Sequence, residues 1–415
     1  MGGVWVSSKD EPDQPDRQDY QEGDTTITVR RVELSEEELQ NYYSGMANSV
    51  LWPVSHYMIH HLEFERAFFR DYDVVNRRFA DVIVEVYHEG DVIWVQDYHL
   101  MLVPLYIRER IPDAKIGFFW HIPWPAMEVY RILPWARTLL QGLLACDLIG
   151  FHVGEYVENF IEGARVLLGA RTWEKGVVWH ERKVRVEAHP IGIDVEHFKN
   201  AANAAGCEVE ELRKEVGTEY LIVGVDRLDY TKGILPRLLA FEELLQKYPE
   251  YHERVTLYQI ATPSRTEVES YRQLKREVDE AVGRINGAFA VSNWVPIRYR
   301  YRPYTQEELV VFYRAADVML VTPIRDGMNL VTQEFIAASE NGVLVLSELT
   351  GAAYLMPEAL QVNSYDHEAL TRVMVEALEM SEAEKRERLS RLKKTVEDLD
   401  VHQWAGRFLT SLEAA

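Results

Sequence analysis

Short apolar runs alternate with helical stretches in the first part of the chain. Residues 100–111 have the spacing of a helix, whereas the runs around them are short and rich in β-branched or aromatic side chains. These strand-like runs occupy residues 91–96, 115–120 and 147–151. Strands that alternate with helices are typical of a parallel sheet covered by helices, so we expect an α/β domain here.

The same alternation starts again after residues 184–194, a segment that we interpret as a hinge. Its strand-like runs occupy residues 220–228, 254–261, 317–323 and 342–347. At 415 residues the chain exceeds what one hydrophobic core usually supports, which favours two domains. We therefore expect an α/β fold with domains over residues 1–188 and 189–395, and a final helix over 396–415 that packs back on the first domain.

The beginning of the chain is polar. Residues 8–25 are acidic and contain proline, a composition that favours a surface loop. A helical pattern begins near residue 36, where Ser35 and Glu38 have the spacing of a capping box.

Acidic residues outnumber basic ones. Asp and Glu number 67 against 45 Lys and Arg, a net charge of −22, which opposes binding to nucleic acid and to anionic membranes. No run approaches the roughly 20 apolar residues that span a bilayer. We therefore expect a cytoplasmic protein, and we leave a homo-oligomer open. Cys146 and Cys207 are too few for a disulfide framework, and the apolar run around Cys146 favours a buried, inert thiol.

Two Rossmann-like units without a G-x-G-x-x-G fingerprint argue against a dinucleotide enzyme and fit a nucleotide-sugar transferase. In open α/β sheets, ligands bind beyond the carboxyl ends of the strands. Arg227 lies at such an end, and Lys232 follows in a turn marked by Gly233. Two cations beside a helix N-terminus suit a diphosphate, although a solvated, salt-bridged loop explains them equally well.

A more specific group of residues follows the run at 317–323. Asp326, Gly327 and Asn329 come just before a helical stretch that contains Glu334. Gly327 lets the backbone approach a ligand, free amides at a helix start bind phosphate, and the acids accept sugar hydroxyls. A plain turn capped by Asp326 would explain Asp326 and Gly327, but not the other polar residues at the same strand end.

The first unit has polar residues at two strand ends. Asp97 directly follows one strand and His121 follows another. A single His is more often structural than catalytic, but two polar residues at adjacent strand ends of one sheet favour a functional site.

These segments resemble the glycosyltransferase family of trehalose-6-phosphate synthases. The matching stretches run from about residue 40 to the C-terminus, in the family's order and near its spacing: NYYSGMANSVLWP, WVQDYHLMLVP, IGFFWHIPWP, VDRLDYTKGI, QIATPSR, GRINGAF, VTPIRDGMNLVTQEF and VLVLSELTGAA. The resemblance implies the GT-B fold, two Rossmann-like domains that face a central cleft. It also implies transfer of glucose, with retention, from a nucleotide donor to glucose 6-phosphate, which gives α,α-trehalose 6-phosphate. UDP-glucose is the favoured donor, and ADP- and GDP-glucose stay open.

The resemblance also assigns roles to residues. Arg227 and Lys232 would hold the donor diphosphate, and Asp326 with Gly327 would hold the donor glucose. Glu334 would bind the ribose, and Tyr304 would lie by the nucleobase. The backbone of Met328, Asn329, Leu330 and Val331 would complete the donor site. Tyr43, Trp52, Asp97 and Arg265 would bind the acceptor, with Arg265 on its phosphate, and His121 would touch the transferred glucose. His121, Asp97, Arg227 and Lys232 would be the catalytic residues. No metal and no cofactor would be needed, because the cations replace a divalent ion.

The chain departs from the family at its start. Family members begin with a strand and a Gly-rich loop, whereas this chain begins at MGGVWV, which corresponds to a later segment. We expect such a chain to transfer slowly or not at all and to expose an unpaired sheet edge. Two other functions stay open: a related transferase with another acceptor, such as a glucosylglycerol-phosphate synthase, and a non-catalytic subunit that binds sugar phosphates.

Overall fold

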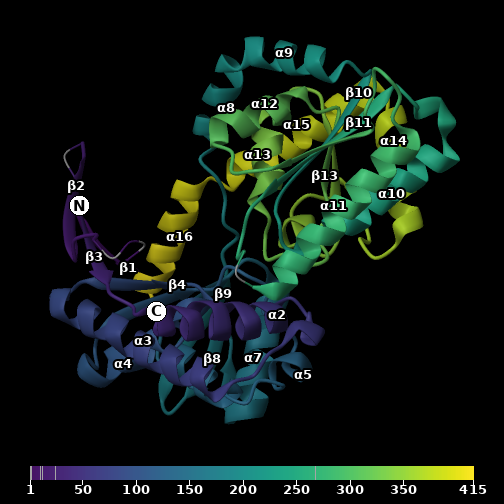
Figure 1. Cartoon of the computed structure of the whole chain (residues 1–415). Helices are drawn as coiled ribbons and strands as arrows, with labels where there is room; N and C mark the ends of the chain where they lie inside the picture. Colours follow the sequence, from purple (N-terminus) through teal and green to yellow (C-terminus); the bar gives the residue numbers. More distant parts are fainter. Residues whose placement is uncertain (1, 10, 12, 24, 267) are drawn as a thin grey trace. The chain divides into compact units, whose positions relative to one another are not determined.

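The computed structural model of the chain describes residues 2–9, 11, 13–23, 25–266 and 268–415. The fold is mixed α/β with sheets of mainly parallel strands, as expected. The chain divides into two compact units (Figure 1). Unit 1 comprises the residues up to His189 together with Gly406–Ala415, and unit 2 comprises Pro190–Ala405.

A six-stranded sheet forms the centre of unit 1, with the strand order β4-β5-β6-β9-β8-β7. Its strands are β4 (Val92–Gln96), β5 (Lys115–Phe119), β6 (Leu148–Phe151), β7 (Arg171–Trp173), β8 (Gly176–Trp179) and β9 (Arg182–Ala188). β4, β5, β6 and β9 are parallel, and β8 pairs antiparallel with both β7 and β9. The three strands predicted from the apolar runs are therefore confirmed.

Unit 1 also contains helices and short helical turns (Figure 1). Among them are α2 (Trp52–Ser55), η2 (Ile59–His61), α3 (Arg66–Val86), η3 (Tyr98–Leu100), α4 (Val103–Arg110), α5 (Met127–Tyr130), α6 (Ala136–Leu143), α7 (Gly154–Leu168) and α16 (Val401–Glu413). The Phe408 ring of α16 stacks on Trp94 of β4 at 4.5 Å. Gly117 and Gly150 make this contact possible, because a Cβ atom on either would lie within 2.8 Å of the Phe408 ring. The last helix therefore packs on the sheet through glycine positions.

A small sheet lies at the start of unit 1. It contains β1 (Gly3–Ser8), β3 (Thr25–Val32) and β2 (Arg17–Glu22) in that spatial order. The prediction of a loop over residues 8–25 is wrong for 17–22, because β2 forms an antiparallel hairpin with β3. Its polar side chains pair across the hairpin, as Thr28 does with Asp19 at 2.7 Å, so a strand forms without an apolar pattern.

The predicted capping box at Ser35 and Glu38 is confirmed at the start of α1 (Glu36–Leu39). The chain then continues as a wider helix with i to i+5 hydrogen bonding, η1 (Gln40–Leu51). Such wide turns are rare and often lie at functional sites. η1 contains Tyr43, one of the candidate acceptor residues.

Unit 2 is built on an all-parallel sheet with the order β12-β11-β10-β13-β14-β15. The strands are β10 (Tyr220–Arg227), β11 (Val255–Thr262), β12 (Ile297–Tyr301), β13 (Val318–Val321), β14 (Val343–Ser347) and β15 (Leu360–Val362). All four predicted strands of this unit are present. The helices and short turns are α8 (Val195–Ala204), α9 (Gly206–Val216), η4 (Tyr230–Lys232), α10 (Ile234–Lys247), η5 (Pro249–Tyr251), α11 (Glu269–Phe289), α12 (Gln306–Ala315), α13 (Leu330–Ala338), η6 (Gly351–Tyr354), α14 (His367–Glu379) and α15 (Glu382–Asp398).

Apolar cores lie on both faces of this sheet. One is shared with α8, α9, α12, α13 and α15, and the other with α10, α11 and α14. Because the six strands are parallel, their carboxyl ends meet along one edge, where ligands bind in open α/β sheets. No helix of the described residues is long and apolar enough to cross a membrane.

Candidate functional site

The carboxyl end of β10 carries two candidate cations. Arg227 is the last residue of β10 and is exposed. Lys232 ends the turn η4 and is only 8% exposed, and its ammonium donates to Asp326 Oδ2 at 2.5 Å. Gly233 follows with a φ of 66°, and a Cβ atom there would lie 2.2 Å from the Thr322 carbonyl oxygen. Lys232 is thus held beside the segment that follows β13, which a freely solvated loop would not require.

The loop between β13 and α13 is ordered by its own side chains. Asp326 Oδ1 accepts from the Gly327 amide at 2.9 Å, and Asn329 Nδ2 donates to Asp326 Oδ2 at 3.0 Å. Asn329 caps α13, because its side-chain oxygen accepts from the Thr332 amide. A plain turn capped by Asp326 is therefore wrong. The Asp326 carboxylate instead accepts hydrogen bonds from the Gly327 amide, the Asn329 carboxamide and the Lys232 ammonium.

A neighbouring loop covers this segment. Asp326 forms a β-bridge with Thr350, and the Met328 carbonyl accepts from the Ala352 amide at 3.1 Å. A Cβ atom on Gly351 would lie 1.9 Å from the Gly327 carbonyl, so only glycine permits this approach. Met328 is buried, and Leu330 and Val331 begin α13, where the first amides of a helix lack acceptors within the helix.

Two further candidates of unit 2 rest on aromatic side chains. Glu334 Oε2 accepts from the Tyr313 hydroxyl at 2.8 Å, and burial raises the pKa of Glu334 against the opposing effect of that hydrogen bond. Tyr304 follows β12, with the Arg302 guanidinium 3.5 Å from its ring centre and Phe312 at its edge. This stacking gives Tyr304 a fixed, partly exposed ring.

Arg265 lies in the turn after β11 and leads to a residue that the sequence did not single out. The Arg265 guanidinium donates to Asp229 Oδ2 at 3.1 Å, and Asp229 is fully buried. Burial alone would raise the pKa of Asp229, but the charges of Arg265, Arg227 and Lys232 lower it to about 2. The charges of three candidate cations therefore act on one buried carboxylate, and Arg265 contacts it directly. No local sequence pattern indicated Asp229, because its partner Arg265 lies 36 positions later in the chain.

In unit 1, the ends of β4 and β5 bring Asp97 and His121 together. Asp97 Oδ1 accepts from the His121 amide at 3.2 Å and from the Tyr98 amide at 2.9 Å. His121 Nε2 lies 2.8 Å from Gln96 Oε1, and burial lowers the pKa of His121, opposed by the Asp97 charge. Asp97 has a φ of 68° and a ψ of 171°, a region that side chains rarely adopt.

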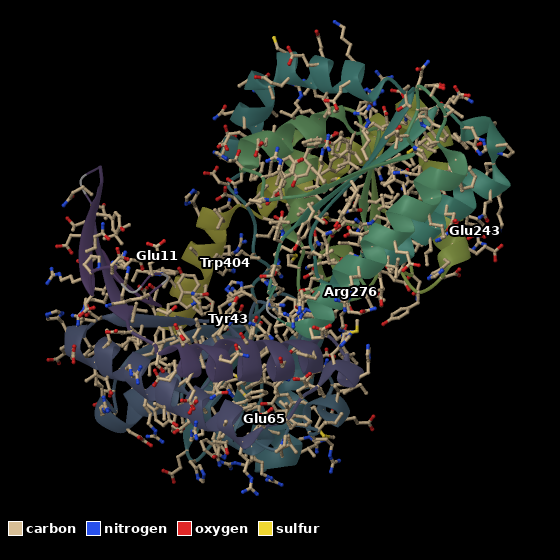
Figure 2. The ribbon with its side chains drawn as sticks, in the orientation of Figure 1. Glu11, Tyr43, Glu65, Glu243, Arg276 and Trp404 are labelled. Carbon is tan, nitrogen blue, oxygen red and sulfur yellow. The ribbon has the colours of Figure 1, made fainter. Side chains whose placement is uncertain are left out.

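The other candidates of unit 1 lie on the preceding helices. Tyr43 is exposed on η1 and stacks on His99, with ring centres 5.6 Å apart (Figure 2). Trp52 begins α2, is buried, and lies against the His56 ring at 4.1 Å. Tyr43, Trp52, Asp97 and His121 thus belong to unit 1, whereas Arg265 and all donor candidates belong to unit 2.

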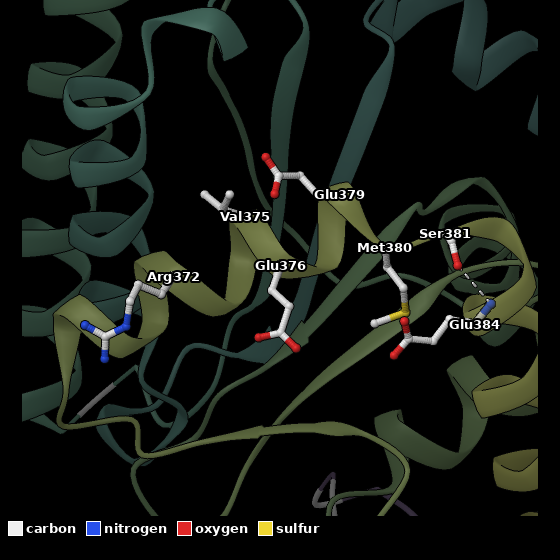
Figure 3. Close-up of a pocket in the computed structure, with 7 residues that line it drawn as sticks. All are labelled: Arg372, Val375, Glu376, Glu379, Met380, Ser381 and Glu384. Carbon is white, nitrogen blue, oxygen red and sulfur yellow. Dashed lines mark hydrogen bonds between the residues drawn. The ribbon is translucent and has the colours of Figure 1, made fainter.

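A surface hollow of about 410 Å³ lies elsewhere in unit 2, where α14 ends and α15 begins (Figure 3). Its polar lining is mostly acidic and includes Glu376, Glu379 and Glu384, together with Arg372. None of the candidate residues lines it, so we do not assign it to the site. Over the described part of the chain, no group of three or more His, Cys, Asp or Glu side chains could hold a metal ion.

Comparisons with known proteins place the chain in a family. The sequence profile of Glycosyltransferase family 20 matches residues 1–414. The UDP-forming α,α-trehalose-phosphate synthase of Pichia angusta is 42% identical over 391 residues, covering 91% of this chain and 82% of the relative. The trehalose-6-phosphate synthase of Mycobacterium avium is 41% identical, covering 99% and 86%. The bifunctional synthase/phosphatase of Thermoproteus tenax is 40% identical, and the chain spans only 57% of its length.

Solved structures agree with the sequence matches. A UDP-forming α,α-trehalose-phosphate synthase from Burkholderia xenovorans, in complex with glucose 6-phosphate, superposes with a TM-score of 0.94 at 33% identity, covering 99% of this chain and 94% of that one. An E. coli protein bound to UDP-2-fluoro glucose gives 0.94 at 34% identity, covering 99% and 93%. These matches confirm the expected GT-B fold. The chain belongs to Glycosyltransferase family 20.

Proposed function

We propose that the protein transfers glucose from UDP-glucose to glucose 6-phosphate, with retention, and forms α,α-trehalose 6-phosphate. The observation that carries this proposal is the group of cations at the strand ends of unit 2, where Arg227 ends β10, Lys232 contacts Asp326 and Arg265 contacts Asp229. Phosphates on both substrates require such cations in a chain whose net charge is −22. Related proteins named as UDP-forming synthases, and a related structure with glucose 6-phosphate, support the choice of substrates.

On the donor side, Arg227 and Lys232 would bind the diphosphate. Arg227 is exposed at the strand end, and Lys232 already contacts a carboxylate that a bound diphosphate would partly replace as its partner. Asp326 would then accept donor glucose hydroxyls, and Glu334 those of the ribose. The backbone from Gly327 to Val331 would supply amides, and Tyr304 would lie beside the base.

On the acceptor side, Arg265 would bind the phosphate of glucose 6-phosphate, because its planar guanidinium makes paired hydrogen bonds to phosphate oxygens. Tyr43 and Trp52 would provide flat faces for the sugar. Asp97 would accept acceptor hydroxyls, and His121 would contact the transferred glucose.

The reaction would take place on one face of the donor sugar. The leaving phosphate oxygen would accept the proton of the acceptor hydroxyl while the new glycosidic bond forms. The contribution of the protein would be positioning and stabilisation of the developing phosphate charge by Arg227 and Lys232. We propose that no cofactor other than the donor is needed and that the protein works in the cytoplasm.

The chemical identity of the reaction product tests this proposal. The chain is incubated with glucose 6-phosphate and, in parallel, with UDP-, ADP- or GDP-glucose, and the products are identified by mass spectrometry and NMR. A disaccharide phosphate with both anomeric protons in the α configuration, formed fastest from UDP-glucose, is expected. A chain in which Arg227 and Lys232 are both replaced by Ala gives the background. A product with glycerol 3-phosphate and none with glucose 6-phosphate would contradict the proposed acceptor.

A further inference from the structure

Arg265 is held in an unusual state for a residue proposed to bind phosphate. Its backbone has a φ of 47°, in the left-handed region that favours glycine. Its side chain is only 6% exposed and points into an ion pair with Asp229. A guanidinium that binds a ligand from such a buried position can do so only if its direction is fixed, because most of its donors are covered by the protein.

Two buried groups fix that direction. Asp229 Oδ2 accepts from Arg265 Nη1 at 3.1 Å, and the same oxygen accepts from the Tyr271 hydroxyl at 2.9 Å. The Tyr271 hydroxyl also accepts from Arg265 Nη1. The three polar groups therefore form a closed triangle, and Tyr271, on α11, is only 2% exposed.

Asp229 is itself fixed by its neighbours. Its other oxygen, Oδ1, accepts from the Thr231 amide at 2.9 Å and from the Thr231 hydroxyl at 2.8 Å. Both carboxylate oxygens are therefore hydrogen-bonded, so the anion is completely satisfied without water. A buried ion pair contributes little net stability after desolvation, which leaves orientation as the main effect of this arrangement.

We infer that Tyr271 and Asp229 are positioning residues that orient Arg265 toward the acceptor phosphate and so set the affinity for glucose 6-phosphate. This inference rests on the proposed function, since it names what determines the acceptor half of that site. Donor affinity should depend on a different buried tyrosine, Tyr313, whose hydroxyl donates to Glu334. The Tyr271 hydroxyl would thus act on the acceptor side of the proposed site, and the Tyr313 hydroxyl on its donor side.

The matched test is Tyr271→Phe against Tyr313→Phe, each of which removes one hydroxyl and keeps the buried ring. Calorimetry on the full chain would measure the Kd of glucose 6-phosphate, and separately that of UDP. Loss of a hydrogen bond to a charged group predicts a Kd for glucose 6-phosphate raised about tenfold or more in Tyr271→Phe, with the Kd of UDP unchanged. Tyr313→Phe should show the opposite selectivity.

Asp229→Asn provides a second variant, because the amide keeps the shape and loses the charge that faces Arg265. This variant should raise the Kd of glucose 6-phosphate more than the Kd of UDP. If Tyr271→Phe binds both ligands as the wild type does, or weakens both equally, the inference is overturned while the proposed function stands. A wild type that binds UDP but not glucose 6-phosphate would instead overturn the proposed acceptor, and with it the role of Arg265 and of its two neighbours. Thermal unfolding of each variant shows that a selective loss does not come from a damaged fold.

Discussion

The strand ends of unit 2 differ from those of unit 1 in how they hold their candidate residues. In unit 2, two of the candidate cations contact carboxylates: Lys232 pairs with Asp326, and Arg265 pairs with Asp229. In unit 1, His121 contacts the neutral amide of Gln96, and Tyr43 stacks on His99. The contacts described above for the candidate residues of unit 1 are hydrogen bonds and ring contacts.

This difference matches the chemistry proposed for each unit. Phosphates carry full charges, and buried ion pairs hold cations in place before the ligand arrives, so no reorganisation is needed during the reaction. Sugar hydroxyls are neutral and require donors and acceptors in fixed directions, which Asp97 and His121 would supply under the proposed function, with Asp97 in an unusual backbone conformation. Mutations can therefore test two properties separately. One is the charge of the candidate side chains in unit 2, and the other is the backbone and hydrogen-bond geometry of the candidate residues in unit 1.

The largest effect should come from a buried ion pair beneath the cations of unit 2. Arg237 is completely buried, pairs with Asp226, and donates to Gln259 at 2.9 Å and to Thr322 at 3.0 Å. Arg237→Ala leaves Asp226 charged and unpaired, which should lower the free energy of unfolding by about 3–5 kcal/mol. Urea unfolding followed by circular dichroism measures it.

Arg254→Ala is the matched control, because its pair with Glu219 is about half exposed. Exposed pairs contribute about 0–1 kcal/mol, so this variant should be close to the wild type. If both variants lost the same stability, the contrast between buried and exposed charges in unit 2 would be wrong.

Replacement of Arg227 tests the contribution of a positive charge to catalysis rather than to folding. Arg227→Ala should lower kcat by roughly a hundredfold or more, because a charge that stabilises the transition state is lost. The residue is exposed, so the unfolding midpoint should hardly change. Steady-state kinetics with and without EDTA checks the proposal. Complete loss of wild-type activity in EDTA, restored by magnesium, would show that a metal ion and not Arg227 neutralises the diphosphate.

Much of the fold was predictable because buried parallel strands are continuous apolar runs. β6, β10 and β14 follow this rule, and each begins and ends within two residues of its predicted bounds. Strands without a continuous apolar run were missed. β2 lies in an acidic stretch, and β12, an edge strand, alternates Arg with Tyr.

The candidate residues were predictable in sequence, but their partners were not. Lys232 and Asp326 could be placed at neighbouring strand ends, whereas their contact depends on Gly233 and on the close approach of Gly351, which only coordinates show. Asp229 was overlooked because a single Asp after a strand reads as a turn residue. Its role depends on Arg265, 36 positions later. Pairings over such separations leave no local pattern.

A third prediction concerns the backbone of unit 1. Asp97 has φ and ψ values of 68° and 171°, which only glycine adopts without strain. Asp97→Gly and Asp97→Ala both remove the carboxylate, so both should reduce transfer. The Gly variant should be more stable than the Ala variant by about 1–3 kcal/mol, the strain that a Cβ atom causes there. Thermal unfolding of the two variants measures the difference.

Glu158 provides the control for this comparison, because it is exposed inside α7, where the backbone is helical. At such a position Gly is less stable than Ala by about 1 kcal/mol, the reverse of the order expected at Asp97. The same order at both positions would mean that Asp97 is not strained.

The smallest effect should be the dependence of stability on pH that His121 causes. Burial lowers the pKa of His121 below its ordinary value of 6.5, so the folded chain holds this ring neutral where the unfolded chain protonates it. The stability from the neutral ring is therefore complete above pH 6.5 and is lost as the pH falls from 6.5 toward the lowered pKa. One such proton changes the free energy of unfolding by at most about 1.4 kcal/mol per pH unit. His121→Gln should flatten the slope of stability against pH in this range. The slope should not vanish in this variant, because burial also lowers the pKa of His189, which the variant keeps. Equal slopes in the wild type and in His121→Gln would show that the ring already accepts a proton in the folded chain. Unit 1 would then hold a cation at its strand ends as unit 2 does, and the contrast between the two units would be lost at this residue.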